Sequence, residues 1–311
     1  MQRPVDRRSV DPMRIVISGS SGLIGTALVD HLRAQGHTIV RLVRRSARGV
    51  DEAVWDPAAG SLDPQVIDGA DAVINLSGAG IGDKRWTDAY KRELLSSRLD
   101  TTSLLARTIA TVDRKPSAFL SGSAIGWYGP CGDEVLDESA PTPGTTFLAD
   151  ICVQWEAAAQ PAANAGVRTA LLRTGIVLSP AGGALKKQLP LFKFGLGGKF
   201  AKGSQWQSWI SLPDEVGAIE HLLTADVSGA VNLTAPAPVT NAEFTTVLAK
   251  VLKRPAIVPV PSFGPKLLLG GELADALLFT GQRVVPTKLQ ASGYSFQHPT
   301  LEVALRALLG R

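Results

Sequence analysis

The feature that most constrains this chain is a glycine loop between a short apolar strand and an amphipathic helix. The loop, residues 19–25 (GSSGLIG), follows a predicted strand at 14–18 and precedes a predicted helix at 26–35. A second apolar strand is predicted at 38–43. Glycines at the first, fourth and seventh loop positions permit a tight turn, close approach to a pyrophosphate and close packing of helix on strand. The free N–H groups of the helix point at the same anion. The unit therefore predicts a dinucleotide-binding βαβ fold.

The residues after the second strand indicate which dinucleotide binds. A carboxylate there would hold the adenosine ribose 2′-hydroxyl and favour NAD, whereas an arginine accommodates a 2′-phosphate and favours NADP. Arg44 stands 19 residues after the last loop glycine, with Arg41, Arg45 and Arg48 nearby and no acid before Asp51. Guanidinium groups donate paired hydrogen bonds to phosphate. A solvated basic turn would have the same composition, but we predict NADP(H) in preference to NAD(H).

Length, charge and cysteine content exclude several classes of protein. The 311 residues suffice for one large α/β domain with a smaller lobe, and 45% hydrophobic residues fit a sizeable core. The net charge is +4 with dispersed basic residues, which predicts no nucleic-acid partner. Cys131 and Cys152 are too few for a disulfide framework or a zinc site, so no metal is expected. No apolar run is long enough for a membrane span, and the polar residues 1–12 lack a signal-peptide core. We therefore expect a flexible N-terminus at 1–12 and a cytoplasmic protein.

Further strand–helix units follow the first. Apolar strands are predicted at 71–76, 118–123 and 167–173, and helices at 88–110 and 147–165 separate them. The first two strands end in small or hydroxyl residues, and ligands bind at the carboxyl ends of strands in such sheets. The alternation predicts an α/β fold, a Rossmann-type doubly wound parallel sheet with a smaller C-terminal α/β substrate lobe. In the later part, we predict a helix starting at Pro213 and another at 242–252, capped by Asn241.

Three motifs together resemble the extended short-chain dehydrogenase/reductases, the NAD(P)-dependent epimerase/dehydratase superfamily. They are residues 19–25, 75–78 (NLSG) and 121–123 (SGS). More narrowly, the chain is similar to a branch named "epimerase family protein", described as sugar-nucleotide epimerases. The hallmarks of this branch here are Trp55-Asp56, Ser97-Arg98-Leu99, Trp155-Glu156, Leu178-Ser179-Pro180 with Gly182-Gly183, Trp209-Ile210 and residues 281–286 (GQRVVP). The last of these resembles a C-terminal domain of unknown function.

The resemblance covers roughly residues 13–309 and implies a division of the chain. Residues 13–180 would form the NAD(P)-binding Rossmann domain, with strands also from 205–235. Residues 181–311 would form mainly the substrate lobe and the C-terminal family-specific domain. The candidate cofactor-binding residues are Gly19, Ser20, Ser21, Gly22, Leu23, Ile24, Gly25, Arg44, Trp55, Asp56, Leu76, Ser77, Gly78, Glu93, Arg98, Ser121, Gly175 and Val177. Core packing is an equally good expectation for Trp55, and a solvated helix face is the safer expectation for Glu93 and for Arg98, each taken alone.

The family's chemistry, as the resemblance implies it, uses a serine, a tyrosine that transfers a proton and a lysine that lowers the tyrosine pKa. Ser123 matches the serine. The other two should begin the helix near 147, but residues 147–152 (FLADIC) contain neither, and Phe cannot carry a proton. Tyr128 is the candidate substitute, which makes Ser123 and Tyr128 the predicted catalytic pair. Ser211 also replaces a histidine that relatives often carry.

Two functions remain open from the sequence. The first is an NADP(H)-dependent epimerase/dehydratase-like oxidoreductase for a small or nucleotide-linked carbonyl or alcohol. In it, Ser123 would hydrogen-bond the reacting oxygen, and Tyr128 or water would move the proton. The second is a non-catalytic NADP(H)-binding sensor or partner-binding protein, which the missing tyrosine and lysine favour. We expect a small-molecule substrate, no membrane partner and a monomer or homodimer.

Overall fold

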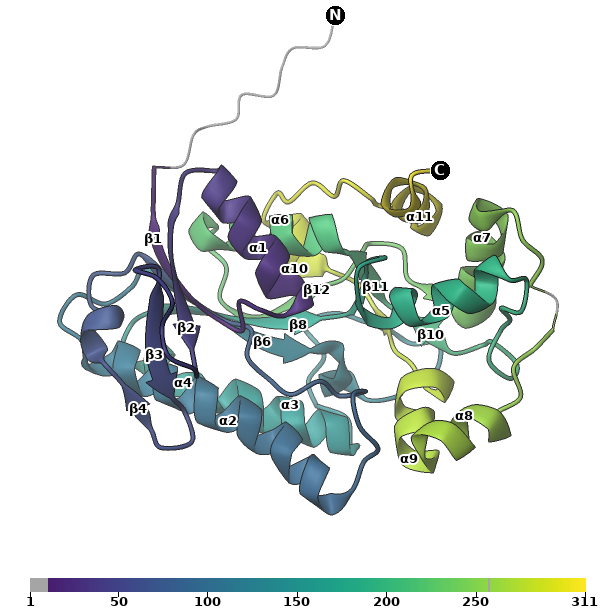
Figure 1. The fold of residues 1–311 in the computed structure, drawn as a ribbon, viewed down its shortest axis with the longest axis horizontal. Helices are drawn as coiled ribbons and strands as arrows, with labels where there is room; N and C mark the ends of the chain where they lie inside the picture. Colours follow the sequence, from purple (N-terminus) through teal and green to yellow (C-terminus); the bar gives the residue numbers. More distant parts are fainter. Residues whose placement is uncertain (1–10, 257) are drawn as a thin grey trace, which may run out of the picture.

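A computed structural model describes residues 11–256 and 258–311 and has an eight-stranded sheet at its centre (Figure 1). Every neighbouring pair is parallel except the last, β3 with β4. This confirms the predicted Rossmann-type fold class. Residues 1–10, most of the N-terminus predicted to be flexible, lie outside the described residues. In spatial order the strands are β12 (Gly229–Leu233), β8 (Arg168–Thr174), β6 (Ala118–Ala124), β5 (Ala72–Asn75), β1 (Arg14–Ser18), β2 (Thr38–Val43), β3 (Glu52–Asp56) and β4 (Ser61–Leu62).

Helices cover both faces of the sheet (Figure 1). One face carries α1 (Leu23–Ala34) and α6 (Leu212–Thr224), and the other carries α2 (Asp88–Thr111), α3 (Phe147–Ala158) and α4 (Gln160–Asn164). Successive side chains of β1 therefore enter different cores. Ile15 and Ile17 pack on the α1 and α6 side, whereas Val16 packs on the α2 side, and all three are fully buried. Burial on both faces explains why the strands are apolar throughout instead of alternating.

Several helix boundaries differ from those predicted. Helix α1 begins at Leu23 instead of Thr26, because Gly22 already serves as its extended N-cap. The helix predicted at 147–165 is divided into α3 and α4, because Pro161 has no N–H to donate to the carbonyl four residues before it. Helix α6 begins at Leu212, one residue before Pro213, since the Ser211 hydroxyl accepts from the backbone of the first turn.

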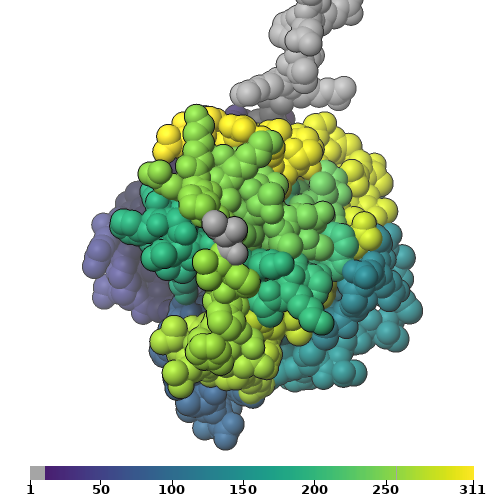
Figure 2. All heavy atoms as spheres, turned by 90° about the vertical axis from the view of Figure 1, so that its right-hand side faces the viewer, coloured from purple at the N-terminus to yellow at the C-terminus, as the bar shows by residue number. Residues whose placement is uncertain are grey.

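The last third of the chain forms shorter elements around a separate core. Helix α7 (Asn241–Leu252) is capped by Thr240 in a capping box with Glu243, so Asn241, the predicted cap, is instead its first residue. Figure 2 shows this end of the molecule, where the teal and green segments lie together. Its core contains Leu189, Trp209, Phe244 and Leu305. The other elements are β7 (Val135–Leu136), β9 (Ile176–Leu178), α5 (Gly183–Lys193), β10 (Trp206–Gln207), β11 (Trp209–Ser211), β13 (Val239–Thr240), α8 (Phe263–Leu269), α9 (Gly271–Ala274), β14 (Arg283–Val284), α10 (Thr287–Ala291) and α11 (Leu301–Leu309).

The predicted division into domains at residue 180 stays a prediction. The strand β12 belongs to the central sheet, where it pairs with β8, although it follows the first elements of the later part in sequence. Among the described residues, none of the helices combines the length and apolar character needed to cross a bilayer.

Candidate cofactor and substrate site

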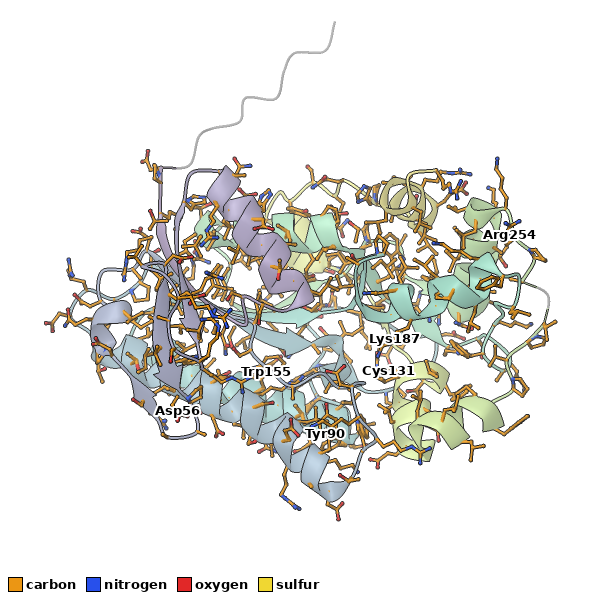
Figure 3. All side chains as sticks on the ribbon, viewed as in Figure 1. Asp56, Tyr90, Cys131, Trp155, Lys187 and Arg254 are labelled. Carbon is orange, nitrogen blue, oxygen red and sulfur yellow. The ribbon has the colours of Figure 1, made fainter. Side chains whose placement is uncertain are left out.

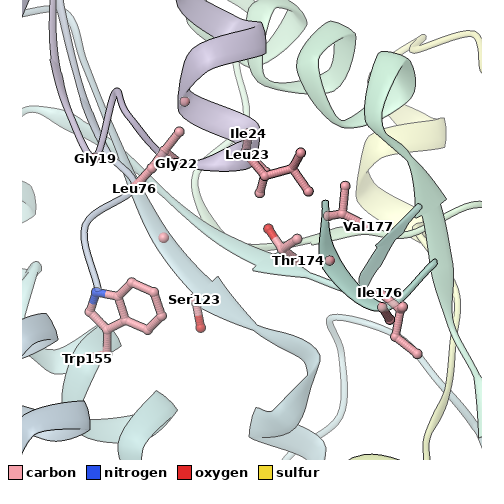
Figure 4. A pocket seen from close by; sticks show the side chains of 14 residues that line it. Gly19, Gly22, Leu23, Ile24, Leu76, Ser123, Trp155, Thr174, Ile176 and Val177 are labelled. Carbon is pink, nitrogen blue, oxygen red and sulfur yellow. The ribbon is translucent and has the colours of Figure 1, made fainter. Parts of the chain in front are cut away.

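A cleft of about 330 Å³ lies where β1, β5, β6 and β8 end (Figure 4). The order of strands reverses between β1 and β5, and ligands of doubly wound sheets bind at such a point. The cleft therefore has the position expected of a dinucleotide site, and its volume is in the range of small-molecule pockets. Its lining residues are Gly19, Gly22, Leu23, Ile24, Gly25, Leu76, Gly122, Ser123, Trp155, Thr174, Ile176, Val177, Gly183 and Ala184.

The glycine loop needs its glycines for close backbone approach. Gly19 has a φ of +73°, and a Cβ on it would lie 2.5 Å from the carbonyl carbon of Leu76. A Cβ on Gly25 would lie 2.2 Å from the carbonyl oxygen of Gly19. The N–H of Gly22 donates to Gly19 and closes the turn. The loop thus brings the start of α1 to the cleft with its free N–H groups, as an anion site requires.

A buried hydrogen-bond network holds the opposite wall of the cleft. The side-chain oxygen of Asn75 accepts from the Ser18 hydroxyl at 2.6 Å and from the N–H of Ser77 at 3.1 Å. Its amide nitrogen donates to Thr102, which also accepts from the indole N–H of Trp155 at 2.8 Å. The network fixes the turn after β5 and the Trp155 ring together. In the sequence, Asn75 could be recognised as a candidate site residue because it is an amide in an apolar strand. Nothing in the sequence around Thr102 indicated its part in the network.

Arg98 lies buried behind Trp155. Its guanidinium carbon is 5.0 Å from the Trp155 ring centre, and a Cβ on Gly78 would lie 3.1 Å from it. It donates to the carbonyl of Leu94, and no carboxylate pairs with it in the part of the chain that the structure describes. Burial lowers its pKa. A buried cation without a counter-ion favours an oxygen-rich or anionic ligand nearby.

Ser123 contacts a buried ion pair at the far end of the cleft. Its hydroxyl donates to Glu156 Oε1 at 2.7 Å. Arg173 donates to both oxygens of Glu156, at 2.8 and 2.9 Å, and the side chains of Glu156 and Arg173 are only 11% and 5% exposed. Cys152, one helical turn before Glu156, is buried, and this burial raises its thiol pKa to about 12. The thiol is therefore neutral near pH 7.

Tyr128, the predicted proton donor, does not line the cleft. It is in the short 3₁₀ helix η2 (Ile125–Tyr128), only 3% exposed, and its hydroxyl donates to Asn232 at 2.8 Å. Burial raises its pKa. A general acid must reach the proton that it transfers, so this placement argues against Tyr128 in that role.

The basic residues after β2 differ in their partners. Arg41 and Arg45 both pair with Glu52, and hydrogen bonding from Arg45 and the Arg48 N–H lowers the Glu52 pKa to about 2. Arg44 is exposed, and among the described residues no hydrogen-bond partner engages it. Two of the basic side chains are thus already paired with carboxylates, whereas Arg44 has no such partner among the described residues.

Several other predicted cofactor residues lie away from the cleft lining. Trp55 is 3% exposed and packs in the core beneath α2, as the alternative expectation had it. Asp56 lies at the outer edge of the sheet and accepts from two backbone N–H groups (Figure 3). Glu93 is exposed and paired with Lys84. Ser121 is fully buried, and no described residue forms a hydrogen bond with its hydroxyl. Ser20, Ser21, Ser77 and Gly175 each adjoin a lining residue and Gly78 is two residues beyond Leu76, but none of the five belongs to the lining.

The fold and the cleft define a dinucleotide-binding α/β protein of the short-chain dehydrogenase/reductase type. Residues 15–234 match the NAD dependent epimerase/dehydratase family, and residues 260–308 match a domain of unknown function (DUF1731). The chain belongs to this epimerase/dehydratase family.

Its relatives cover nearly the whole chain. "Epimerase family protein Mb2239" of Mycobacterium bovis is 45% identical over 292 residues, 94% of this chain and 96% of that protein. Human "epimerase family protein SDR39U1" is 35% identical over 300 residues, 96% of this chain and 100% of that protein. The crystal structure of human SDR39U1 (isoform 2) with NADPH has a TM-score of 0.88 at 34% identity, covering 96% of this chain and 99% of that chain.

Proposed function

We propose that this protein is an NADP(H)-dependent oxidoreductase of the epimerase/dehydratase type, acting on a small or nucleotide-linked carbonyl or alcohol. The observation that carries this is one cleft in which the glycine loop and the Ser123 hydroxyl face the same space. The first can hold a pyrophosphate, and the second can hydrogen-bond a reacting oxygen. A protein in which these residues only stabilised the sheet would not need the loop and the hydroxyl in one cleft.

The proposed cofactor lies across the cleft in a defined direction. Its pyrophosphate is held at the glycine loop, and its adenosine 2′-phosphate by Arg44 at the end of β2. Its nicotinamide reaches toward Ser123, Thr174 and Val177. Arg98 and the turn at residues 76–78 contact the ribose–phosphate portion between these ends. The NADPH in the human relative's structure title supports the choice of NADP(H). Bound there, the nicotinamide would supply or accept the hydride.

A second function has one observation in its favour. Residues 147–152 hold neither a tyrosine nor a lysine, so the family's usual proton-transfer pair is absent from α3. A protein that binds NADP(H) without turning over a substrate, as a redox sensor or partner-binding module, would not need that pair. The retained Ser123 and its carboxylate partner favour the enzyme.

Titration of NADPH and NADH, followed by nicotinamide fluorescence, tests the cofactor site. We expect NADPH to bind more tightly than NADH. Arg44→Ala should weaken NADPH about 10-fold or more and leave NADH unchanged, because a hydrogen bond to a charged group contributes about 1.5–3 kcal/mol. Arg107→Ala, an exposed arginine on the outer surface of α2, is the matched control. Equal losses for both cofactors would contradict the 2′-phosphate role, and binding of neither would contradict the proposed function.

A further inference from the structure

The Trp155-Glu156 pair was noted in the sequence, but the proposed cofactor site uses only its tryptophan. Glu156 is on α3, one helical turn beyond residues 147–152, where the tyrosine and lysine are missing. It contacts Ser123 of β6 and Arg173 of β8, so three neighbouring elements meet at one carboxylate. Together these three residues form a cluster that reaches the cleft through Ser123.

The cluster is held rigidly. Both carboxylate oxygens of Glu156 accept from Arg173, and the Arg173 guanidinium is stacked 3.7 Å above the Trp127 ring. Burial alone would lower the Arg173 pKa, but the hydrogen bond and charge of Glu156 outweigh it, and the net change is upward. Arg173 therefore stays charged and keeps the carboxylate oriented toward Ser123.

The direction of the Ser123 hydrogen bond follows from the chemistry of its partner. An ionised carboxylate only accepts hydrogen bonds, so the Ser123 hydroxyl is the donor in this 2.7 Å contact. Its oxygen lone pairs are left for the cleft. A ligand group that binds Ser123 must then donate a hydrogen bond to its oxygen. An alcohol hydroxyl can donate such a bond, whereas a carbonyl oxygen cannot.

The other proton carriers near the cleft lack such an arrangement. The Cys152 thiol is buried and neutral, and the Tyr128 hydroxyl is committed to Asn232. Glu215 is fully buried behind Thr174, with one oxygen accepting from the Thr174 hydroxyl. Among residues 11–256 and 258–311, only Glu156 combines a direct contact with a cleft-lining hydroxyl and a fixed counter-charge.

We propose, resting on the function proposed above, that Glu156 is the proton acceptor of the reaction and acts through Ser123, with Arg173 as the residue that positions it. The substrate alcohol donates its hydrogen bond to Ser123. The carbon–hydrogen bond breaks and its electron pair leaves as hydride to NADP⁺, while the carbon–oxygen double bond forms. The hydroxyl proton passes to Ser123 Oγ as the Ser123 proton passes to Glu156. Carbonyl reduction by NADPH reverses each transfer.

A double-mutant cycle on alcohol oxidation tests this relay. NADP⁺ and the probe alcohols indanol and tetralol are mixed with the whole chain, and NADPH fluorescence reports the rate. Glu156→Gln and Ser123→Ala should each lower kcat by about 100-fold or more, within the range for loss of a positioned proton carrier. The double variant should be no slower than the slower single one, because both groups act in one transfer. NADP⁺ affinity should stay close to that of the unmodified protein in both variants, and so should the KM of Glu156→Gln, whereas Ser123→Ala should also raise KM because it removes the hydrogen bond to the substrate alcohol.

A solvent isotope effect separates the relay from a structural role. Oxidation in D₂O should be slower than in H₂O for the unmodified chain, and Glu156→Gln should lose this difference in its residual rate. Asp68→Asn, which removes another carboxylate held by an arginine but far from the cleft, is the matched control and should keep both kcat and the isotope effect. Ser123→Ala leaves the Glu156–Arg173 pair intact, so it remains informative if Glu156→Gln unfolds.

Each contrary result has a distinct meaning. A folded Glu156→Gln protein with unchanged kcat overturns the relay, and so do effects of the two substitutions that multiply. An unmodified chain that binds NADP⁺ but oxidises neither probe also overturns the relay, while its cofactor site stands. Failure to bind either cofactor overturns the proposed function itself.

Discussion

Burial, more than local sequence, determines the protonation state of single residues around the cleft. Glu215 shows this most clearly, because it is fully buried and one of its oxygens has no hydrogen-bond partner among the described residues. The other oxygen accepts from Thr174 at 2.9 Å. Burial raises the Glu215 pKa to about 8, although the Thr174 hydrogen bond acts in the opposite direction. The folded protein therefore keeps a neutral carboxylic acid beside the cleft near pH 7.

This burial predicts a pH dependence of stability. The unfolded chain loses the Glu215 proton near its ordinary pKa of about 4.3, whereas the folded chain keeps it until about pH 8. Between these values the folded state binds more protons, so this group makes the free energy of unfolding fall as pH rises, by up to about 1.4 kcal/mol per pH unit. Glu215→Gln should remove that contribution. Urea unfolding at several pH values across this window measures it.

The control for this measurement is Glu134→Gln, which changes an exposed carboxylate in a loop. It should leave the pH dependence as it is. A Glu215→Gln protein whose stability falls with pH as steeply as that of the unmodified chain would show that Glu215 ionises freely in the folded state.

At the scale of elements, the spacing between β6 and α3 depends on one glycine. A Cβ on Gly122 would lie 2.7 Å from Trp155 Cζ2 and 3.2 Å from the carbonyl oxygen of Asn75. The Trp155 ring cannot easily retreat, because its N–H is bonded to Thr102 and Arg98 lies behind it. The close approach lets an aromatic side chain of α3 form part of the cleft wall.

Gly122→Ala should therefore destabilise the protein by about 1–3 kcal/mol, the usual cost of overpacking a core. It should also weaken NADPH binding, since Trp155 and Gly122 both line the cleft. Gly126→Ala is a matched control in the next element, where the nearest atom to an added Cβ is Leu148 Cβ at 3.4 Å. Chemical unfolding and NADPH titration of both variants would check this. Equal stability of the two would mean that α3 shifts freely.

How far the sequence predicts such features depends on whether they are local. The glycine loop, the strands and the glycine-loop end of the cleft follow from a motif and apolar runs within one βαβ unit. The partners of Glu156 could not be predicted, because Ser123 and Arg173 come from different strands and meet it only through the sheet order. The placement of Tyr128 could not be predicted for the same reason, because its hydroxyl partner, Asn232, is 104 residues away in the sequence.

At the scale of the whole molecule, one buried carboxylate attaches the C-terminal segment to helix α6, which packs on the central sheet. Asp214, in the first turn of α6, accepts from the N–H groups of Gln297 and His298 at 2.7 and 3.0 Å. It also accepts from Tyr294 and from Ser211, the residue that replaces the expected histidine. His298 of the C-terminal segment contacts the Ser211 hydroxyl at 2.8 Å. An imidazole from a distant part of the sequence therefore lies beside the position where relatives often carry a histidine.

Asp214→Asn should loosen this attachment while the sheet stays folded. An amide cannot accept at its nitrogen, so hydrogen bonds to the charged oxygen are lost, each contributing about 1.5–3 kcal/mol. Amide hydrogen exchange should accelerate at residues 294–300 more than in β1 or β5. Glu302→Gln, in the same part of the chain, breaks only surface ion pairs with Lys250 and Arg306 and should leave that exchange unchanged. Unchanged protection in Asp214→Asn would assign the attachment to the packing of Tyr294 and Phe296 against the core instead.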